Sequence, residues 1–181
     1  MDHWLTIQIH QWAGQAGWLD GVIFFLAEPL AYFLGLAAVI AWFKPVWLGF
    51  DQSRWSARHI IAAGLAAAFF ARVVIKEAVV LFIDRARPFE VLEELKPLIE
   101  QSEGASLPSG HAIFFFTLTA AWLGYNRRIG WWLGLGAGLM ALARVAAGVH
   151  WVSDVLAGAG LGLAFGLAVS LVLQKRLKKN E

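Results

Sequence analysis

Residues 151–173 read WVSDVLAGAGLGLAFGLAVSLVL, an apolar stretch whose only charged side chain is Asp154. A helix that crosses about 30 Å of hydrocarbon needs roughly 20 mostly apolar residues, so this stretch is long enough to span a bilayer. Small residues on one helix face allow transmembrane helices to pack closely. The residues that would form such a face here are Gly158, Gly160, Gly162 and Gly166.

Three more stretches reach a similar length and a fourth, at 110–125, is shorter, and the composition of the whole chain agrees with them. They cover about residues 18–43, 60–83, 110–125 and 129–149. Hydrophobic residues make up 59% of the 181 residues and charged residues 15%, whereas soluble domains have about 45–50% and about 25%. Ten Trp and thirteen Phe also suit the aromatic belts found at membrane interfaces.

We therefore predict an all-α fold, a polytopic membrane helix bundle of five to six helices that forms a single domain over residues 1–181. Residues 1–15 are too polar to span a bilayer and lack the basic start and cleavage site of a signal peptide. Their aromatic and aliphatic side chains predict an N-terminal interfacial helix. The absence of Cys excludes a disulfide framework and a thiol nucleophile. The net charge of +2 gives no reason to expect nucleic acid as a partner.

The Lys and Arg residues outside the predicted spans are unevenly distributed between the two sides of the membrane. One side has only Arg85, Arg87 and Lys96. The other has nine cations, namely Lys44, Arg54, Arg58, Arg127, Arg128, Lys175, Arg176, Lys178 and Lys179. Because cytoplasmic loops carry the excess of Lys and Arg, the nine-cation side is predicted to be cytoplasmic.

Three polar clusters lie at the ends of predicted spans on the opposite, outer side. The first is Asp84-Arg85-Ala86-Arg87-Pro88, the second is Leu107-Pro108-Ser109-Gly110-His111, and the third joins Arg144, His150 and Asp154. Ionisable groups at membrane depth cost several kcal/mol, which makes a functional site the default expectation.

These side chains are suited to bind and transfer a phosphate. Arg grips phosphate oxygens bidentately, and a helix that starts at Pro-Ser-Gly offers backbone N–H groups to an anion. On a helix, His150 and Asp154 share a face, so the carboxylate can hold the imidazole tautomer. His111 can then protonate a leaving oxygen. The carboxylates are too few and scattered for a metal site, and the pattern fits phosphoryl transfer through a phosphohistidine.

The same residues resemble the type 2 phosphatidic acid phosphatase (PAP2) superfamily of membrane lipid phosphatases, whose signatures are roughly K-x6-R-P, P-S-G-H and S-R-x5-H-x3-D. Arg87-Pro88, Pro108-Ser109-Gly110-His111 and Arg144-x5-His150-x3-Asp154 occur here in that order. The resemblance implies His150 as nucleophile, Asp154 as its orienting partner and His111 as general acid. It implies that no metal or cofactor is needed and that the phosphate is held by Arg87, Arg144, Ser109 and Gly110, with Pro108 beside them.

Two positions depart from these signatures. Ala143 stands where the pattern has Ser, and Val80 stands where it has Lys. Lys76 lies eleven residues before Arg87 instead of seven, on the same helix face to within about 20° but about 6 Å deeper. Lys76 can snorkel back over part of that distance, and Arg85 is the competing candidate for the missing cation.

We predict a hydrolase, a metal-independent lipid phosphatase in the inner membrane of a bacterium with its active site facing outward. The outward site and the R-x-R-P-F form of the first motif resemble undecaprenyl-diphosphate phosphatases of the bacitracin-resistance type, which implies conversion of undecaprenyl diphosphate to undecaprenyl phosphate. The alternatives are a phosphatidylglycerophosphate or phosphatidate phosphatase, a vanadate-dependent haloperoxidase, and a transporter or non-catalytic membrane scaffold. The expected partners are the lipid phosphate or diphosphate and the bilayer, and the sequence gives no oligomeric state.

Two other charged features have simpler interpretations. Glu28 and Arg72 lie about 15–16 Å below the outer end of their spans, which favours a structural ion pair between the two helices, with Lys76 or Glu77 as alternative partners. Residues 90–103 contain five Glu and one Lys, which is typical of a solvated outer loop. The apolar residues of this loop have helical spacing that would suit the membrane surface or a lid: Val91, Leu92, Leu95, Leu98 and Ile99.

Overall fold

The computed structural model describes residues 1–43, 54–100 and 104–179, and every regular element in this part of the chain is a helix. The prediction of an all-α fold is thereby confirmed. The helices are α1 (Asp2–His10), α2 (Gly17–Ala27), α3 (Pro29–Phe43), α4 (Arg54–Phe70), a π-helical segment (Ala71–Ile75), α5 (Lys76–Val80), α6 (Pro88–Val91), α7 (Gly110–Leu123), α8 (Arg127–Ala146) and α9 (Val152–Lys179). The connection at 44–53, with Lys44, lies outside the described residues.

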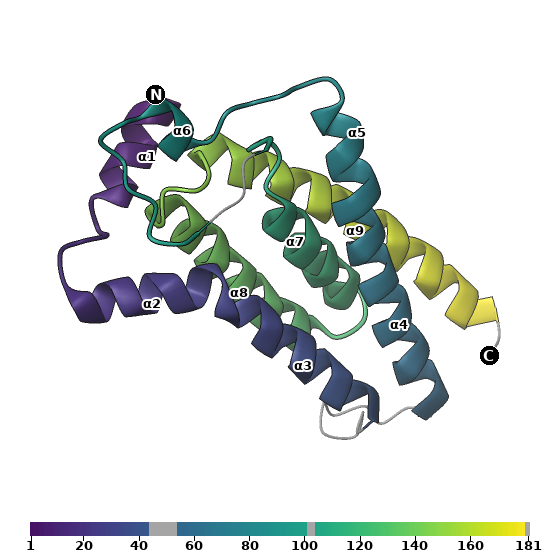
Figure 1. The fold of residues 1–181 in the computed structure, drawn as a ribbon. Helices are drawn as coiled ribbons and strands as arrows, with labels where there is room; N and C mark the ends of the chain where they lie inside the picture. The colour runs from purple at the N-terminus through teal and green to yellow at the C-terminus, as the bar shows by residue number, and fades with distance from the viewer. Residues whose placement is uncertain (44–53, 101–103, 180–181) are drawn as a thin grey trace.

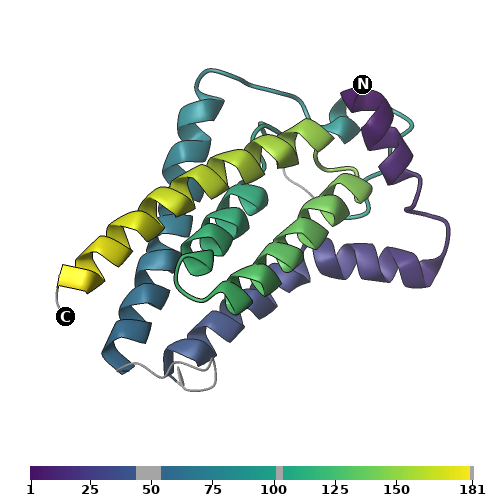
Figure 2. The same cartoon turned by 180° about the vertical axis from the view of Figure 1, so that it is seen from behind.

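Helix α7 is the centre of the bundle. It packs against α9, α8 and α4, and both views show it enclosed by these neighbours (Figures 1 and 2). Ten of its 14 residues are buried, although the helix is too short to count among the candidate membrane spans. The first turn of α7, which carries the Pro-Ser-Gly-His motif, is therefore held by several surrounding helices.

The glycines of α9 bring that helix close to α7. A Cβ added at Gly158 would lie 2.7 Å from the carbonyl oxygen of Ser109, and one at Gly162 would lie 2.6 Å from that of Ile113. Gly166 is equally close to α7, whereas Gly160 faces open space. The predicted small-residue face is confirmed for three of its four glycines, and Gly160 was wrongly included because it lies on the opposite side of the helix.

Residues 18–43 were predicted to form one membrane span, but they do not form one straight helix. The axes of α2 and α3 differ by 47°, and Glu28 between them has φ −134° and ψ −65°. Proline disfavours the helical conformation at the residue before it, and Pro29 begins α3. The break also releases a backbone acceptor, because the N–H of Ala31 donates to the carbonyl of Glu28 rather than to that of Ala27.

Two of the described helices, α8 and α9, are each long and apolar enough to cross a membrane, and α2 with α3 would add a third span if the bent pair forms one. In place of the predicted span 60–83, α4, the π-helical segment and α5 follow one another directly, beginning at Arg54 and ending at Val80. Helices α1 and α6 and the loop after α5 lie at one end of the bundle, and the C-terminal end of α9 and the α7–α8 connection lie at the other (Figures 1 and 2).

The segment after α6 is a loop, as its acidic composition indicated, and does not form the alternative amphipathic helix on the membrane. The helix ends at Val91, and Leu95 and Ile99 are buried, with 7% and 3% of their surface exposed. Ile99 belongs to a core cluster with residues of α2 and α8, against which Leu98 packs. The apolar residues therefore anchor this loop to the bundle, because a protein core is available nearer than the lipid. Residues 101–103 lie outside the described part.

Candidate active site

The turn between α8 and α9 places Arg144, His150 and Asp154 together. Gly148 has φ 78°, a left-handed conformation that is readily reached only by glycine and that commonly ends helices. The chain then reverses, and α9 begins at Val152. His150 and Asp154 were predicted to share a helix face, but His150 precedes the helix, so they meet across its first turn instead.

Asp154 is fully buried and faces His150. Its Oδ2 lies 3.6 Å from Nδ1 of His150 and accepts hydrogen bonds from the backbone N–H of Trp151 at 2.8 Å and from the hydroxyl of Ser106. Ser106 Oγ also lies 3.4 Å from Nδ1 of His150. Since these groups occupy the Nδ1 side of the imidazole, Nε2 is the nitrogen left to react.

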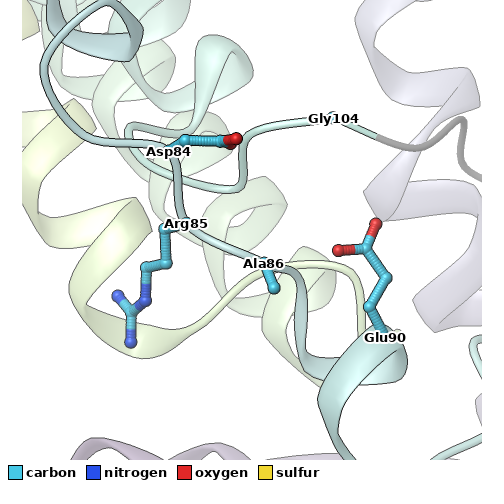
Figure 3. A pocket seen from close by; sticks show the side chains of 5 residues that line it. All are labelled: Asp84, Arg85, Ala86, Glu90 and Gly104. Atoms are coloured by element: carbon cyan, nitrogen blue, oxygen red, sulfur yellow. The ribbon is translucent and has the colours of Figure 1, made fainter.

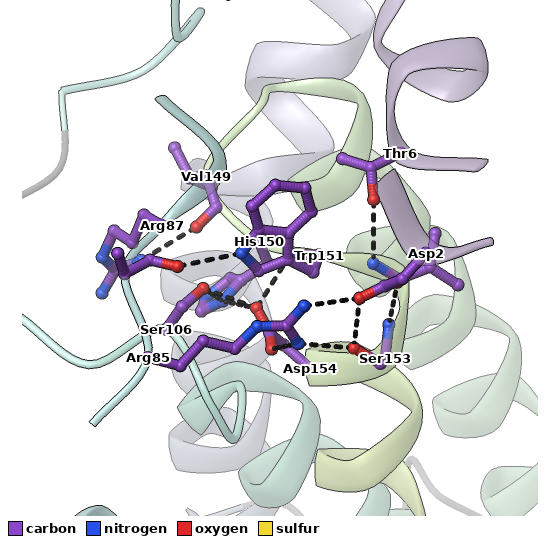
Figure 4. Close-up of polar contacts among 12 residues, drawn as sticks. Asp2, Thr6, Arg85, Arg87, Ser106, Val149, His150, Trp151, Ser153 and Asp154 are labelled. Carbon is purple, nitrogen blue, oxygen red and sulfur yellow. Dashed lines mark hydrogen bonds and ion pairs between the residues drawn. The ribbon is translucent and has the colours of Figure 1, made fainter. Parts of the chain in front are cut away.

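Arg85 is held by carboxylates rather than directed at a phosphate site. Its Nη1 donates to Asp154 Oδ1 at 2.8 Å and its Nη2 to Asp2 Oδ2 at 2.6 Å, as Figure 4 shows. Burial raises the pKa of Asp2, but hydrogen bonds from Ser153 and Arg85 outweigh that effect and lower it. Arg85 thus orients Asp154, and of the two candidates for the missing first-motif cation, Lys76 is the one whose side chain lies beside the start of α7, with its Cδ 3.4 Å from the point that a Cβ of Gly110 would occupy.

Helix α1 forms an outer wall of the site. The ring of His3 stacks on that of Trp151 with centroids 4.3 Å apart, and Thr6 Oγ1 accepts a hydrogen bond from the backbone N–H of Val152 at 3.2 Å. Trp4 and Trp12 on the same segment are exposed. One face of α1 therefore contacts the start of α9, and the other offers aromatic side chains to the surroundings, as an interfacial helix would.

The guanidinium groups of Arg87 and Arg144 are both buried and belong to the same site, although the two residues are far apart in the sequence. Arg87 donates to the carbonyl of Val149 at 3.0 Å and to that of Gly104 at 3.2 Å, and its backbone N–H donates to Glu90 at 2.8 Å. Arg144 donates to the carbonyl of Ala27 at 3.1 Å, the acceptor released by the break before Pro29. These backbone contacts fix both side chains.

The first turn of α7 completes the cluster. Ser109 Oγ is buried and has no hydrogen-bond partner among the described residues, which is unusual for a buried hydroxyl and suits a site that receives a polar ligand. His111 is close enough to Arg144, Arg72, His150 and Lys76 for their charges to act on it. The structure therefore brings together the side chains of the three predicted clusters, with Pro108 and Gly110 in the backbone between them.

The predicted ion pair between Glu28 and Arg72 is not formed, nor is one between Arg72 and Glu77, in the part of the chain that the structure describes. Arg72 instead turns toward the start of α7, where a Cβ added at Gly110 would lie 2.6 Å from its Nη1. The charge of Glu28 acts on Arg144. The prediction of an ion pair was wrong because it used only the membrane depth of Glu28 and Arg72, which does not show the helix face on which each residue lies.

A cavity of about 320 Å³ opens between α3, the Arg72 region and α7. Its polar lining residues are Arg72 and His111, and the others are Ala31, Tyr32, Gly35, Phe69, Phe114 and Phe115. A second cavity, of about 420 Å³, lies at the loop end of the molecule and is lined by Asp84, Arg85, Ala86, Glu90 and Gly104 (Figure 3). A phosphate would meet two carboxylates in the second cavity, so the first is the better match for a lipid with a phosphorylated headgroup.

Burial lowers the pKa of His150 to about 4, and the neighbouring carboxylate of Asp154 opposes that shift. An unfolded His has a pKa of about 6.5, so between these values the unfolded chain binds more protons and stability falls as the pH falls. We expect the melting temperature of the wild type, relative to a His150→Gln variant, to drop between about pH 7 and about pH 4.5. A constant difference across this range, measured by thermal unfolding in detergent, would contradict the buried neutral imidazole.

Sequence reasoning missed Ser106, Asp2 and Ser153. Ser153 donates to Asp2 Oδ2 from its hydroxyl at 2.6 Å and to Oδ1 from its backbone N–H at 3.0 Å. Nothing in the local sequence separates Ser106 from other loop serines. Ser153 lies between the histidine and the aspartate of the third motif, and that position was the only available signal.

Comparison with known proteins identifies the family. The family model described as the PAP2 superfamily matches residues 59–178. The chain is 31% identical over 152 residues to "Bacitracin transport permease protein BcrC" of Bacillus licheniformis, covering 83% of this chain and 70% of that protein. It is also 31% identical over 169 residues to "Undecaprenyl-diphosphatase BcrC" of Bacillus subtilis, covering 92% and 81%.

Two solved structures share the fold. Aquifex aeolicus LpxE matches with a TM-score of 0.72 at 23% identity, over 93% of both chains. A transmembrane PAP2-type phosphatidylglycerolphosphate phosphatase from Bacillus subtilis matches with a TM-score of 0.64 at 19% identity, over 99% of this chain and 86% of that one. With its apolar helices, its buried Arg87, Arg144 and His150 and a family match over about two thirds of its length, this chain belongs to the PAP2 superfamily of phosphatases and is an integral membrane hydrolase.

Proposed function

We propose that this enzyme hydrolyses undecaprenyl diphosphate to undecaprenyl phosphate through a phosphohistidine on His150. The observation that carries the chemistry is that the buried side chains of His150, Asp154, Arg87 and Arg144 lie close together, with the first turn of α7 in contact with Asp154. The similarity to an undecaprenyl-diphosphatase at 31% identity supports the choice of lipid.

In the proposed first step, Nε2 of His150 attacks the terminal phosphorus while Asp154 stabilises the positive imidazole through Nδ1. The bond between that phosphorus and the bridging oxygen breaks, and His111 gives its proton to the departing oxygen. Arg87, Arg144, the hydroxyl of Ser109 and the backbone N–H of Gly110 hold the phosphoryl oxygens, and Lys76 adds positive charge, while the N–H of Ser109 donates to the carbonyl of Asp154. Since protein cations supply this charge, the proposed reaction needs no metal.

In the second step, water attacks the phosphorus of the phosphohistidine and His111 accepts a proton from it. The N–P bond breaks, inorganic phosphate leaves, and His150 returns to its neutral form. The hydroxyl of Ser106 contacts both His150 and Asp154, which keeps the carboxylate in place through both steps.

The 320 Å³ cavity supports a lipid substrate. Its lining includes Arg72 and His111, and the remaining lining residues are mostly aromatic and small apolar side chains. A prenyl tail would lie along this apolar lining while the headgroup reaches the histidines. The start of α8, which carries Arg127 and Arg128, and the C-terminal end of α9 lie at the opposite end of the bundle (Figure 1), which supports a site that faces the outer side of a bacterial inner membrane.

A panel of purified lipids tests this proposal. We expect kcat/KM in detergent to be higher for undecaprenyl diphosphate than for phosphatidylglycerophosphate or phosphatidate by about tenfold or more. The His150→Ala protein, prepared in the same way, controls for contaminating phosphatases. A higher kcat/KM for either phospholipid would transfer the assignment to that lipid, and absence of phosphate release from all three would favour a transporter or scaffold.

A further inference from the structure

Arg72 is a charged residue that the proposed mechanism does not use. It lies in the π-helical segment between α4 and α5, among the apolar side chains of a predicted span. Within the described residues it takes part in no hydrogen bond or ion pair. A charged side chain at such a depth is expensive and marks a functional site by default, and π-helical turns are frequent at such sites.

The guanidinium of Arg72 is directed at the general-acid side of the active site. Its Nη1 is 2.6 Å, and Cδ of Lys76 is 3.4 Å, from the point that a Cβ of Gly110 would occupy. Arg72 also shares the 320 Å³ cavity with His111, and its charge acts on both His111 and Arg144. Gly110 therefore leaves room for an Arg side chain next to His111.

The position of Arg72 beside His111 points to a contact with the group that leaves in the proposed reaction. In the proposed mechanism, Arg87, Arg144 and the start of α7 hold the transferred phosphoryl group, next to His150. His111 gives a proton to the departing oxygen, so a cation beside His111 faces the departing part of the substrate. In a monophosphate that part is an uncharged alcohol, whereas in a diphosphate it is a second phosphate with its own negative charge.

We propose that Arg72 binds the second, departing phosphate of a lipid diphosphate and thereby sets a preference for diphosphates over monophosphates. The inference rests on the proposed phosphatase function and adds a specificity residue to it. The contact forms a charge-assisted hydrogen bond to an oxygen that gains charge as the bridging bond breaks. A monophosphate lacks that oxygen and gains nothing from Arg72.

Farnesyl diphosphate and farnesyl phosphate test this directly, because they share one tail and differ by one phosphate. We expect Arg72→Met to lower kcat/KM for the diphosphate by about 10- to 100-fold and to leave that for the monophosphate essentially unchanged. Arg72→Lys should recover part of the loss. Arg128→Met is the matched control, because it removes an exposed cation near the start of α8. Thermal unfolding checks that each variant folds.

Inhibition by inorganic ions separates the two proposals. With farnesyl phosphate as substrate, Arg72→Met should weaken inhibition by pyrophosphate but not by phosphate. Equal losses for both farnesyl substrates, or unchanged values for both, would overturn the role of Arg72 while leaving the phosphatase function intact. If the wild type releases phosphate from neither substrate, the proposed function itself fails.

Discussion

Replacing His150 with Ala should reduce lipid diphosphate hydrolysis by about 10⁴-fold or more, because the nucleophile and the covalent route disappear together. Only 3% of the surface of His150 is exposed, but its side chain contacts mainly polar groups, so the variant should remain folded. Rapid quenching of the wild type with a diphosphate labelled at the terminal phosphorus should trap an acid-labile phosphoenzyme. The same experiment with His150→Ala should trap none.

His10→Gln is the control for that experiment. His10 lies at the end of α1 and contacts the carbonyl of Ala146 at 2.8 Å through Nδ1, so it is an interfacial histidine with no contact to Asp154. This variant should retain the labelled phosphoenzyme. Full activity of purified His150→Ala, or a phosphoenzyme that survives in it, would exclude His150 as the nucleophile.

Replacing His111 with Asn should produce the second large loss, and its size should depend on the leaving group. General acid catalysis contributes about 10²–10⁴-fold, and an alkoxide needs a proton more than a phosphate does. The decrease in kcat/KM should therefore be largest for farnesyl phosphate, smaller for farnesyl diphosphate and smallest for p-nitrophenyl phosphate, whose leaving group departs without a proton.

The comparison of the three substrates also distinguishes proton donation from phosphate binding. If His111 only held the phosphoryl oxygens, all three reactions would slow by the same factor, because they share the transferred group. The phosphoenzyme formed from p-nitrophenyl phosphate should accumulate in His111→Asn, since the same residue is proposed to activate water in the second step. Equal losses without accumulation would reassign His111 to binding.

The meeting of the three motifs could be predicted because each lies at the end of an apolar stretch. Successive membrane helices place alternate connections on the same side, so Arg87, His111 and His150 had to share one depth. The order of the motifs in the sequence also resembled a known family. The sequence was therefore sufficient to predict which residues form the site. The close packing of α9 against a neighbouring helix could likewise be predicted from the glycines of α9.

The partners of the charged residues could not be predicted in the same way. Arg85 and Asp2 are 83 positions apart, and no periodic pattern connects α1 with the loop after α5. The direction of Arg72 depends on a π-helical segment, for which the local sequence has no signal comparable to that of a proline break. Pro29, in contrast, did carry the information about the bend before α3, and only its angle required the structure.

The attachment of α1 to the start of α9 has a consequence for handling the enzyme. Asp2 holds Arg85, and Arg85 holds the carboxylate that faces His150, while the outward aromatic side chains of α1 depend on an amphiphilic layer. A detergent that fails to reproduce this layer would release α1 first, since a short terminal helix loosens at a lower free energy than the bundle. Catalytic competence would then vanish at temperatures where circular dichroism still reports a fully helical protein.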